Sequence, residues 1–228
     1  MKKKFYLIDK EEQRLTDTTF HISFEDNDVL ELSFIPKEKG HADDGVLIHD
    51  YHLIELEDGI FQVFFPYEGN TYIIDLNLYT KNAFRICSDE YKTGSLSYTN
   101  AGNRPITNQE KAVDFWLRFF DEHDETAIDD YLSDPYIQHN PTVKDGVKAF
   151  YDEFHERFKT DMKECTTKIK HVSSRGDLVF IHNVLKRSPE VRGHAAVDIF
   201  RFENGRIVEH WDVIQKMPES SVNEHPMF

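Results

Sequence analysis

The chain has 228 residues, 39% of them hydrophobic, and a formal net charge of −15 at pH 7. A chain of this length forms one large or two small domains and can bury a core without disulfides or a metal. The negative charge opposes binding to nucleic acid and to anionic lipid, and no apolar run is long enough to span a membrane. Cys87 and Cys165 form no CxxC pair, which excludes a disulfide scaffold. We therefore expect a soluble, cytoplasmic, acidic globular protein that binds neither nucleic acid nor a membrane surface.

The first 100 residues contain short apolar segments that alternate with polar residues, and turn signals separate them. No segment there has a helical face. Strands joined by short turns form an antiparallel meander, which curls into a barrel to bury its edges. The sequence therefore predicts an all-β, lipocalin-like barrel domain over residues 1–100, followed by a polar linker over Ser97–Pro105. The segments in question are 29–35, 60–65, 72–76 and 83–86.

The remainder, residues 106–228, begins with helical patterns. Thr107 and Glu110 form a capping box, a short helical pattern lies near residues 127–132, and Asp145 is the predicted N-cap of a third helix. After Lys163 the apolar period becomes two. This order predicts an α+β cone, in which three helices cover one face of a curved antiparallel sheet. The predicted strands lie near 166–172, 177–186, 192–202 and 206–215.

Asp198 is the leading catalytic candidate. Alternation along its strand places it on the same face as Ala196, Phe200 and Phe202. Burial of a carboxylate among apolar side chains costs several kcal/mol or raises its pKa, so the position is costly unless it is used.

Polar residues on neighbouring segments provide the other candidates. His182 lies in an apolar strand in phase with Phe180, and Pro141 keeps the preceding Asn140 extended, so that His139 and Asn140 point to opposite sides. An isolated strand histidine is more often structural than catalytic. The prediction is that Asp198, His182 and His139 carry proton transfer. Predicted substrate contacts are Asn140, Phe180, Phe200, His210, Trp211 and Asp212.

A metal site formed by His139, His182 and Asp198 is a minor alternative, because imidazole and carboxylate ligands suit zinc or iron. These residues are spread over several segments and are not spaced i, i+2 or i, i+4. No metal or other cofactor is therefore expected.

Two sequence strings carry a resemblance to a known family. They are YIQHNPTVKDGVKAFYDEF and GHAAVDIFRFENGRIVEHWDVIQKMPESSVNEHPMF. Residues 108–228 resemble the SnoaL-like branch of the nuclear-transport-factor-two-like superfamily. The resemblance implies a cone of one curved sheet and three helices. It also implies a homodimer formed through the outer face of the sheet, which would present Val197, Ile199, Ile207, Trp211 and Val213.

The best-known enzymes of that branch are polyketide cyclases, which close a ring by aldol condensation without metal or cofactor. Asp198 matches their acid/base aspartate. In related steroid isomerases the acid at this position stays protonated and donates to the enolate oxygen, so both roles remain open. The chain lacks the Gly-Thr-His motif of the cyclases, having Lys186–Arg192 as a short connection. It also has Asn140 where the isomerases place their base.

The resemblance therefore implies a cofactor-independent acid/base enzyme acting on a small apolar carbonyl compound, as an aldol cyclase, isomerase or hydratase. The alternative is a non-catalytic small-molecule-binding protein with two cavities. The terminal segment Met217–Phe228 is expected to fold over the pocket or across the dimer.

The first half resembles, more weakly, MoaF-like barrels. The resemblance is carried by a Gly-His pair near residue 41 and by the string HLIELEDGIFQVFFPYEGNTYIIDLNLYTKNAFRI. Those barrels are thought of as small-molecule binders.

Overall fold

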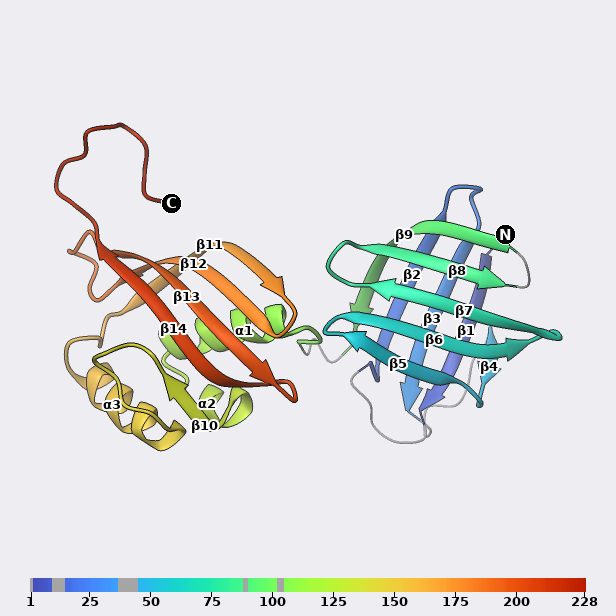
Figure 1. Ribbon diagram of the computed structural model, residues 1–228, viewed down its shortest axis with the longest axis horizontal. Coiled ribbons are helices and arrows are strands. Elements are labelled where there is room, and N and C mark those ends of the chain that lie inside the picture. The colour runs from blue at the N-terminus through green and yellow to red at the C-terminus, as the bar shows by residue number, and fades with distance from the viewer. Residues whose placement is uncertain (1, 10–14, 37–44, 88–89, 102–104) are drawn as a thin grey trace. The chain divides into compact units, whose positions relative to one another are not determined.

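A computed structural model describes residues 2–9, 15–36, 45–87, 90–101 and 105–228 (Figure 1). The chain divides into two compact units, residues 1–107 and 108–228. Residues Ser97–Asn100 of the predicted linker belong to a strand, and Gly102–Arg104 lie outside the described residues. The Gly40-His41 pair of the predicted barrel also lies outside them.

The first unit is a single nine-stranded sheet with the strand order β4-β1-β3-β2-β9-β8-β7-β6-β5. Its strands are β1 (Lys2–Asp9), β2 (Thr18–Phe24), β3 (Val29–Pro36), β4 (Val46–Ile48), β5 (His52–Glu57), β6 (Ile60–Tyr67), β7 (Asn70–Asn77), β8 (Asn82–Cys87) and β9 (Glu90–Asn100).

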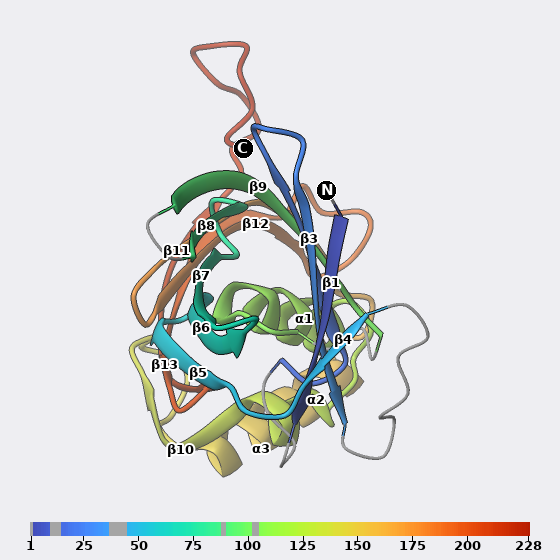
Figure 2. The same cartoon turned by 90° about the vertical axis from the view of Figure 1, so that its right-hand side faces the viewer.

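The predicted closed antiparallel barrel is not confirmed, because this sheet is open. The terminal strands β4 and β5 do not pair with each other within the described part of the chain, and β1 pairs in parallel with both β3 and β4. The sheet nevertheless curls, as Figure 2 shows. Phe5 of β1 lies 4.9 Å from Phe65 and 5.6 Å from Tyr72, measured between ring centroids, so the core forms inside the curl. The meander prediction failed because β1 enters the sheet between strands that follow it in the chain.

The second unit is the predicted α+β arrangement. Three helices lie on one face of a five-stranded sheet of order β10-β14-β13-β12-β11 (Figure 1). Each helix that the structure describes is too short or too polar to cross a membrane. The elements are α1 (Asn108–Phe120), α2 (Ala127–Tyr131), β10 (Leu132–Gln138), α3 (Val147–Lys159), β11 (Thr166–Arg175), β12 (Leu178–Lys186), β13 (His194–Glu203) and β14 (Arg206–Lys216).

Three details of this unit differ from the sequence predictions. The edge strand β10, parallel to β14, was not predicted, because Asp134 and Pro135 interrupt its apolar alternation. Asp145 is not a helix cap: helix α3 begins at Val147, whose amide donates to Asp134, whereas Asp145 accepts from the amide of Gln138.

Ile207 lies in the core and not on the outer face of the sheet. It is fully buried opposite Phe202, because the pairing of β13 with β14 shifts register between Arg201 and Phe202. The shift leaves Val208 as an extra residue, and a bulge of this kind reverses the face on which the following residues lie.

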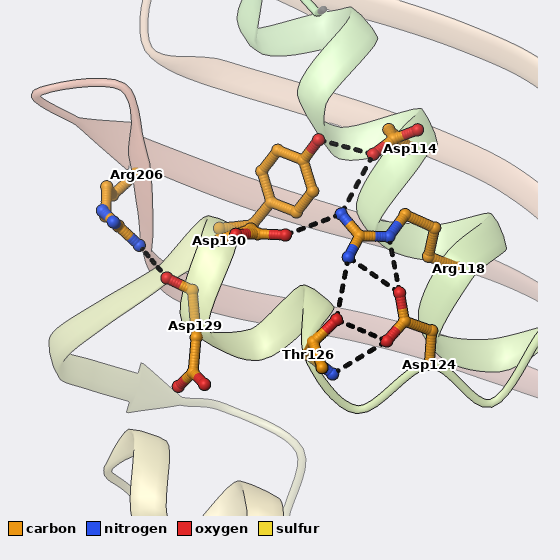
Figure 3. A network of polar contacts seen from close by, with 8 residues as sticks. Asp114, Arg118, Asp124, Thr126, Asp129, Asp130 and Arg206 are labelled. Carbon is orange, nitrogen blue, oxygen red and sulfur yellow. Dashed lines mark hydrogen bonds and ion pairs between the residues drawn. The ribbon is translucent and has the colours of Figure 1, made fainter.

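The guanidinium group of Arg118 connects helices α1 and α2 (Figure 3). Arg118 of α1 lies within 2.7 Å of Asp124 and 2.8 Å of Asp130, and its Nη1 atom is 3.6 Å from Asp114. Arg206 donates to the carbonyl oxygen of Asp129, which joins β14 to α2. The network therefore fixes α1 and α2 relative to each other and to the sheet.

We expect Arg118→Met to lower the free energy of unfolding by about 1–3 kcal/mol, because three aspartates lose one shared cation. Urea denaturation of the purified variants measures the loss. Lys148→Met is the matched control, since it removes a single exposed ion pair with Asp152 worth only about 0.3–0.5 kcal/mol. Equal losses in the two variants would show that the Arg118 network adds nothing beyond one surface pair.

Candidate active site

The concave side of the second sheet encloses a cavity of about 100 Å³, space for several water molecules. Strand β13 contributes Ala196, Asp198 and Phe200, so the alternation predicted for this strand is present. Aromatic rings from the helices form much of the wall, namely Phe115, Trp116, Phe120, Phe150 and Phe154. The cavity therefore has an apolar wall on the helix side and a cluster of polar side chains on the sheet side.

Asp198 lies at the centre of this polar cluster and is only 2% exposed. Its Oδ2 atom accepts a hydrogen bond from Nδ2 of Asn183 at 2.6 Å, and its Oδ1 atom lies 3.0 Å from Nε2 of His210. Burial raises the pKa of Asp198 and the nearby Asp212 raises it further, whereas the bonds from His210 and Asn183 lower it. The pKa of Asp198 therefore lies above its ordinary value.

A second carboxylate faces the same cavity. Asp212 of β14 is paired directly with Asp198 across the two strands, but it is partly exposed. Its Oδ2 atom accepts from Nδ2 of Asn140 at 2.6 Å. The two acids are thus neighbours in different environments, which is the arrangement that separates the roles of acid and base.

Strand β10 supplies residues that the sequence analysis missed. Tyr136 and Gln138 alternate along it and line the cavity, next to the predicted Asn140, which follows the strand. The Oε1 atom of Gln138 lies 3.0 Å from Nδ1 of His210 and accepts from the Asn140 amide at 2.9 Å. Burial raises the pKa of Tyr136, and the charges of Asp198 and Asp212 add to the effect. The alternation of Tyr136 and Gln138 was a visible signal once β10 was recognised as a strand.

Residues 110–219 match the family model described as SnoaL-like polyketide cyclase. The second unit is SnoaL-like. The resemblance stated for this half of the chain is therefore confirmed over the matched residues. A comparison with curated proteins gave no match. The MoaF-like resemblance of the first half stays a prediction.

Solved structures similar to about half of this chain share low sequence identity with it. TsrD from Streptomyces laurentii is 19% identical, with a TM-score of 0.40, and the match covers 47% of this chain and 87% of that one. An NTF2-like protein of unknown function from Cytophaga hutchinsonii is 15% identical, with a TM-score of 0.41 and coverages of 50% and 94%. An NTF-2 like protein of unknown function from Burkholderia xenovorans is 18% identical, with a TM-score of 0.42 and coverages of 50% and 88%.

Four predicted residues lie outside the cavity of the SnoaL-like unit. His182 and Phe180 share a strand face, as predicted, but it is the outer face, because Val179, Ile181 and Asn183 point inward. The ring of His182 stacks on His171 with 3.1 Å between their Nδ1 atoms. These placements correct the roles expected for His182 and Phe180.

His139 and Trp211 also point away from the cavity. Their rings stack at 4.7 Å, and His139 binds Glu209 at 2.9 Å. His139 and Asn140 do diverge as predicted, and only Asn140 reaches the cavity. The terminal Phe228 lies against the outer face, 6.5 Å from the ring of His182, and not over the cavity. Of the predicted site residues, the structure brings together Asp198, Asn140, Phe200, His210 and Asp212.

A metal ion would find a different set of ligands from the predicted one. Within the described residues, Asp198, His210 and Asp212 present ligand atoms that lie within 4.8 Å of one another. His139 and His182 take no part in this group. Asp198 and His210 already bind each other, and a metal would have to replace that contact.

Proposed function

We propose that the SnoaL-like unit is a cofactor-independent acid/base enzyme that transfers protons at the carbon next to the carbonyl of a small, largely apolar compound. The observation that carries this proposal is the pair of neighbouring carboxylates, Asp198 and Asp212, in a cavity whose helix side is lined mostly by aromatic rings. An aldol cyclisation, a double-bond isomerisation and a hydration all use such transfers. The family match of residues 110–219 supports the cyclase or isomerase type of reaction.

The cavity offers what enolate chemistry needs. A base must remove a proton from carbon, and a donor must stabilise the charge that develops on oxygen. Asp212, partly exposed, and Asp198, buried with a raised pKa, provide two carboxyl groups in unlike environments. The aromatic walls fit an apolar ring system.

Hydrogen exchange tests the proposal without knowledge of the natural substrate. We would incubate the protein in D₂O with 1-indanone, 2-tetralone and ethyl acetoacetate and follow the loss of α-proton signals by NMR. At least one compound should exchange about 100-fold faster than in buffer alone, and the Asp198→Asn variant should not accelerate it.

Binding of these compounds in the cavity without any acceleration of exchange would contradict the proposal and favour the non-catalytic binding protein.

We further propose that the unit forms a homodimer through the outer face of its sheet, where Val197 is 36% and Val213 is 71% exposed. Sedimentation analysis of the purified chain tests the dimer separately.

A further inference from the structure

Gln138 connects the Asp198–His210 pair to the backbone. Its Oε1 atom accepts from the amide of Asn140 at 2.9 Å and lies 3.0 Å from Nδ1 of His210. The amide of Gln138 in turn donates to Asp145 at 2.8 Å, which fixes the position of the residue at the end of β10. Gln138 is therefore held from two sides.

The backbone amide of Asn140 determines which atom of the Gln138 side-chain amide, the oxygen or the nitrogen, lies next to it. A backbone N–H can only donate, so the Gln138 atom beside it must be the oxygen and not the NH₂ group. That oxygen can only accept. His210 must consequently carry a hydrogen on Nδ1, since a bare Nδ1 would place two lone pairs 3.0 Å apart.

The hydrogen on Nδ1 of His210 determines whether a proton must lie between Nε2 of His210 and Asp198. A neutral imidazole with Nδ1–H has a bare Nε2, and that atom lies 3.0 Å from Oδ1 of Asp198. If Asp198 were ionised, a lone pair of its Oδ1 atom would face the lone pair of the bare Nε2, and the two would repel each other. The contact therefore requires one proton, either on Asp198 or on Nε2, and the pair as a whole is neutral in both cases.

The acid paired with Asp198 favours that neutral state, whereas the hydrogen bond from Asn183 and the cavity arginines act against it. Asp198 is faced by Asn183 from β12, by Asp212 from β14 and by Tyr136 from β10. Helices α1 and α3 contribute aromatic rings, and Arg157 and Arg187 also line the cavity. The residue paired directly with Asp198 is another acid, which opposes a second negative charge at this point.

We propose that Gln138 is a positioning residue that holds His210 as the Nδ1–H tautomer, so that Asp198 and His210 share one proton and act as the acid, while Asp212 acts as the base. This assignment rests on the proposed function. The carboxylate of Asp212 takes a proton from the carbon next to the carbonyl, breaking a C–H bond. The Asp198–His210 pair gives its shared proton to the carbonyl oxygen, which yields an enol.

Loss of the shared proton leaves the lone pairs of Asp198 and His210 opposed, so the pair takes a proton back readily. The cycle closes when Asp212, which is partly exposed and exchanges its proton with water, delivers a hydrogen to carbon and the enol oxygen returns its proton to the pair. Atoms and charge balance without any reactant besides water.

The tautomer of His210 can be measured with no substrate present. We would record ring ¹⁵N shifts of the ¹⁵N-labelled protein at neutral pH and assign His210 with the His210→Gln variant. The wild type should show a protonated Nδ1. Gln138→Met keeps the side-chain length but removes the acceptor, and it should shift His210 toward the Nε2–H tautomer, which donates to an ionised Asp198.

Gln138→Glu is the conservative control, because it retains an acceptor oxygen and should retain the Nδ1–H tautomer. In the exchange assay Gln138→Met should lose at least about tenfold in rate, since a histidine in the wrong tautomer cannot pass the proton, and Gln138→Glu should lose less. A purely structural role would lower thermal stability without moving the tautomer.

A bare Nδ1 on His210 in the wild type would overturn the inference, as would an unchanged tautomer in Gln138→Met. If Gln138→Met does not fold, the wild-type spectrum alone decides. Absence of hydrogen exchange would instead contradict the proposed function and leave the tautomer result standing, so the two failures are distinguishable.

Discussion

We expect the Asp198→Asn variant to lose the whole of the roughly 100-fold acceleration of α-proton exchange while remaining folded. Asparagine mimics the protonated acid: its NH₂ group can donate to Nε2 of His210 and its oxygen can accept from Asn183, so both hydrogen bonds of the site persist. The amide has no proton to give to substrate. NMR exchange rates and near-UV circular dichroism of the same samples measure the two properties.

The same variant should change how stability depends on pH. Burial raises the pKa of Asp198 above its ordinary value of 3.8, so the unfolded chain ionises first as the pH rises. Stability from this group is complete below about pH 4 and falls as the pH rises through the pKa of the folded state. Asparagine does not ionise. The variant should therefore gain on the wild type from about pH 4 upward, by about 1.4 kcal/mol for each unit of the shift.

Urea denaturation at pH 4, 5.5 and 7 compares the two proteins. A stability difference that stays constant over this range would mean that Asp198 ionises normally in the fold. An exchange rate equal to that of the wild type would remove Asp198 from the acid/base role.

The largest loss of stability should come from Phe119→Ala, at about 3–5 kcal/mol. Phe119 of α1 is fully buried, and its ring lies within 5.5 Å of the rings of Phe115, Phe120, Phe150, Phe154 and Phe158. It thus joins α1 to α3, the two helices that wall the cavity. Removing the ring leaves a cavity that the surrounding rings cannot all move to fill.

Differential scanning calorimetry measures the effect. Phe119→Leu is the matched control, because it keeps most of the apolar volume and should cost clearly less. A similar loss in both variants would show that ring stacking, and not filled volume, determines the contribution of this position.

The face on which Asp198 lies could be predicted because its strand alternates clearly. Apolar partners at Ala196 and Phe200 mark one face, and Val197 and Arg201 mark the other. The same alternation placed His210 and Asp212 together. It failed for His182, since β12 is apolar on both faces and its inner face contains Asn183. Periodicity separates two faces of a strand, but packing against the helices decides which one is inside.

Gln138 could not be found in this way. Its contact with His210 depends on the parallel pairing of β10 with β14, between residues 72 positions apart in the chain. The open first sheet was missed for a similar reason, because β1 pairs with strands across long connections. Short turns are visible in a sequence, whereas long-range pairings are set by the whole core.

The open edge at β5 affects how the protein behaves in concentrated solution. This strand pairs only with β6 within the described residues, and its Ile54 and Leu56 side chains are 46% and 55% exposed. Unpaired edges of this kind recruit strands from other molecules unless charge prevents it. Exposed Glu55 and Glu57 lie on the same strand. We therefore expect repulsion between copies to oppose aggregation through this edge, and acidification or high salt to weaken that repulsion.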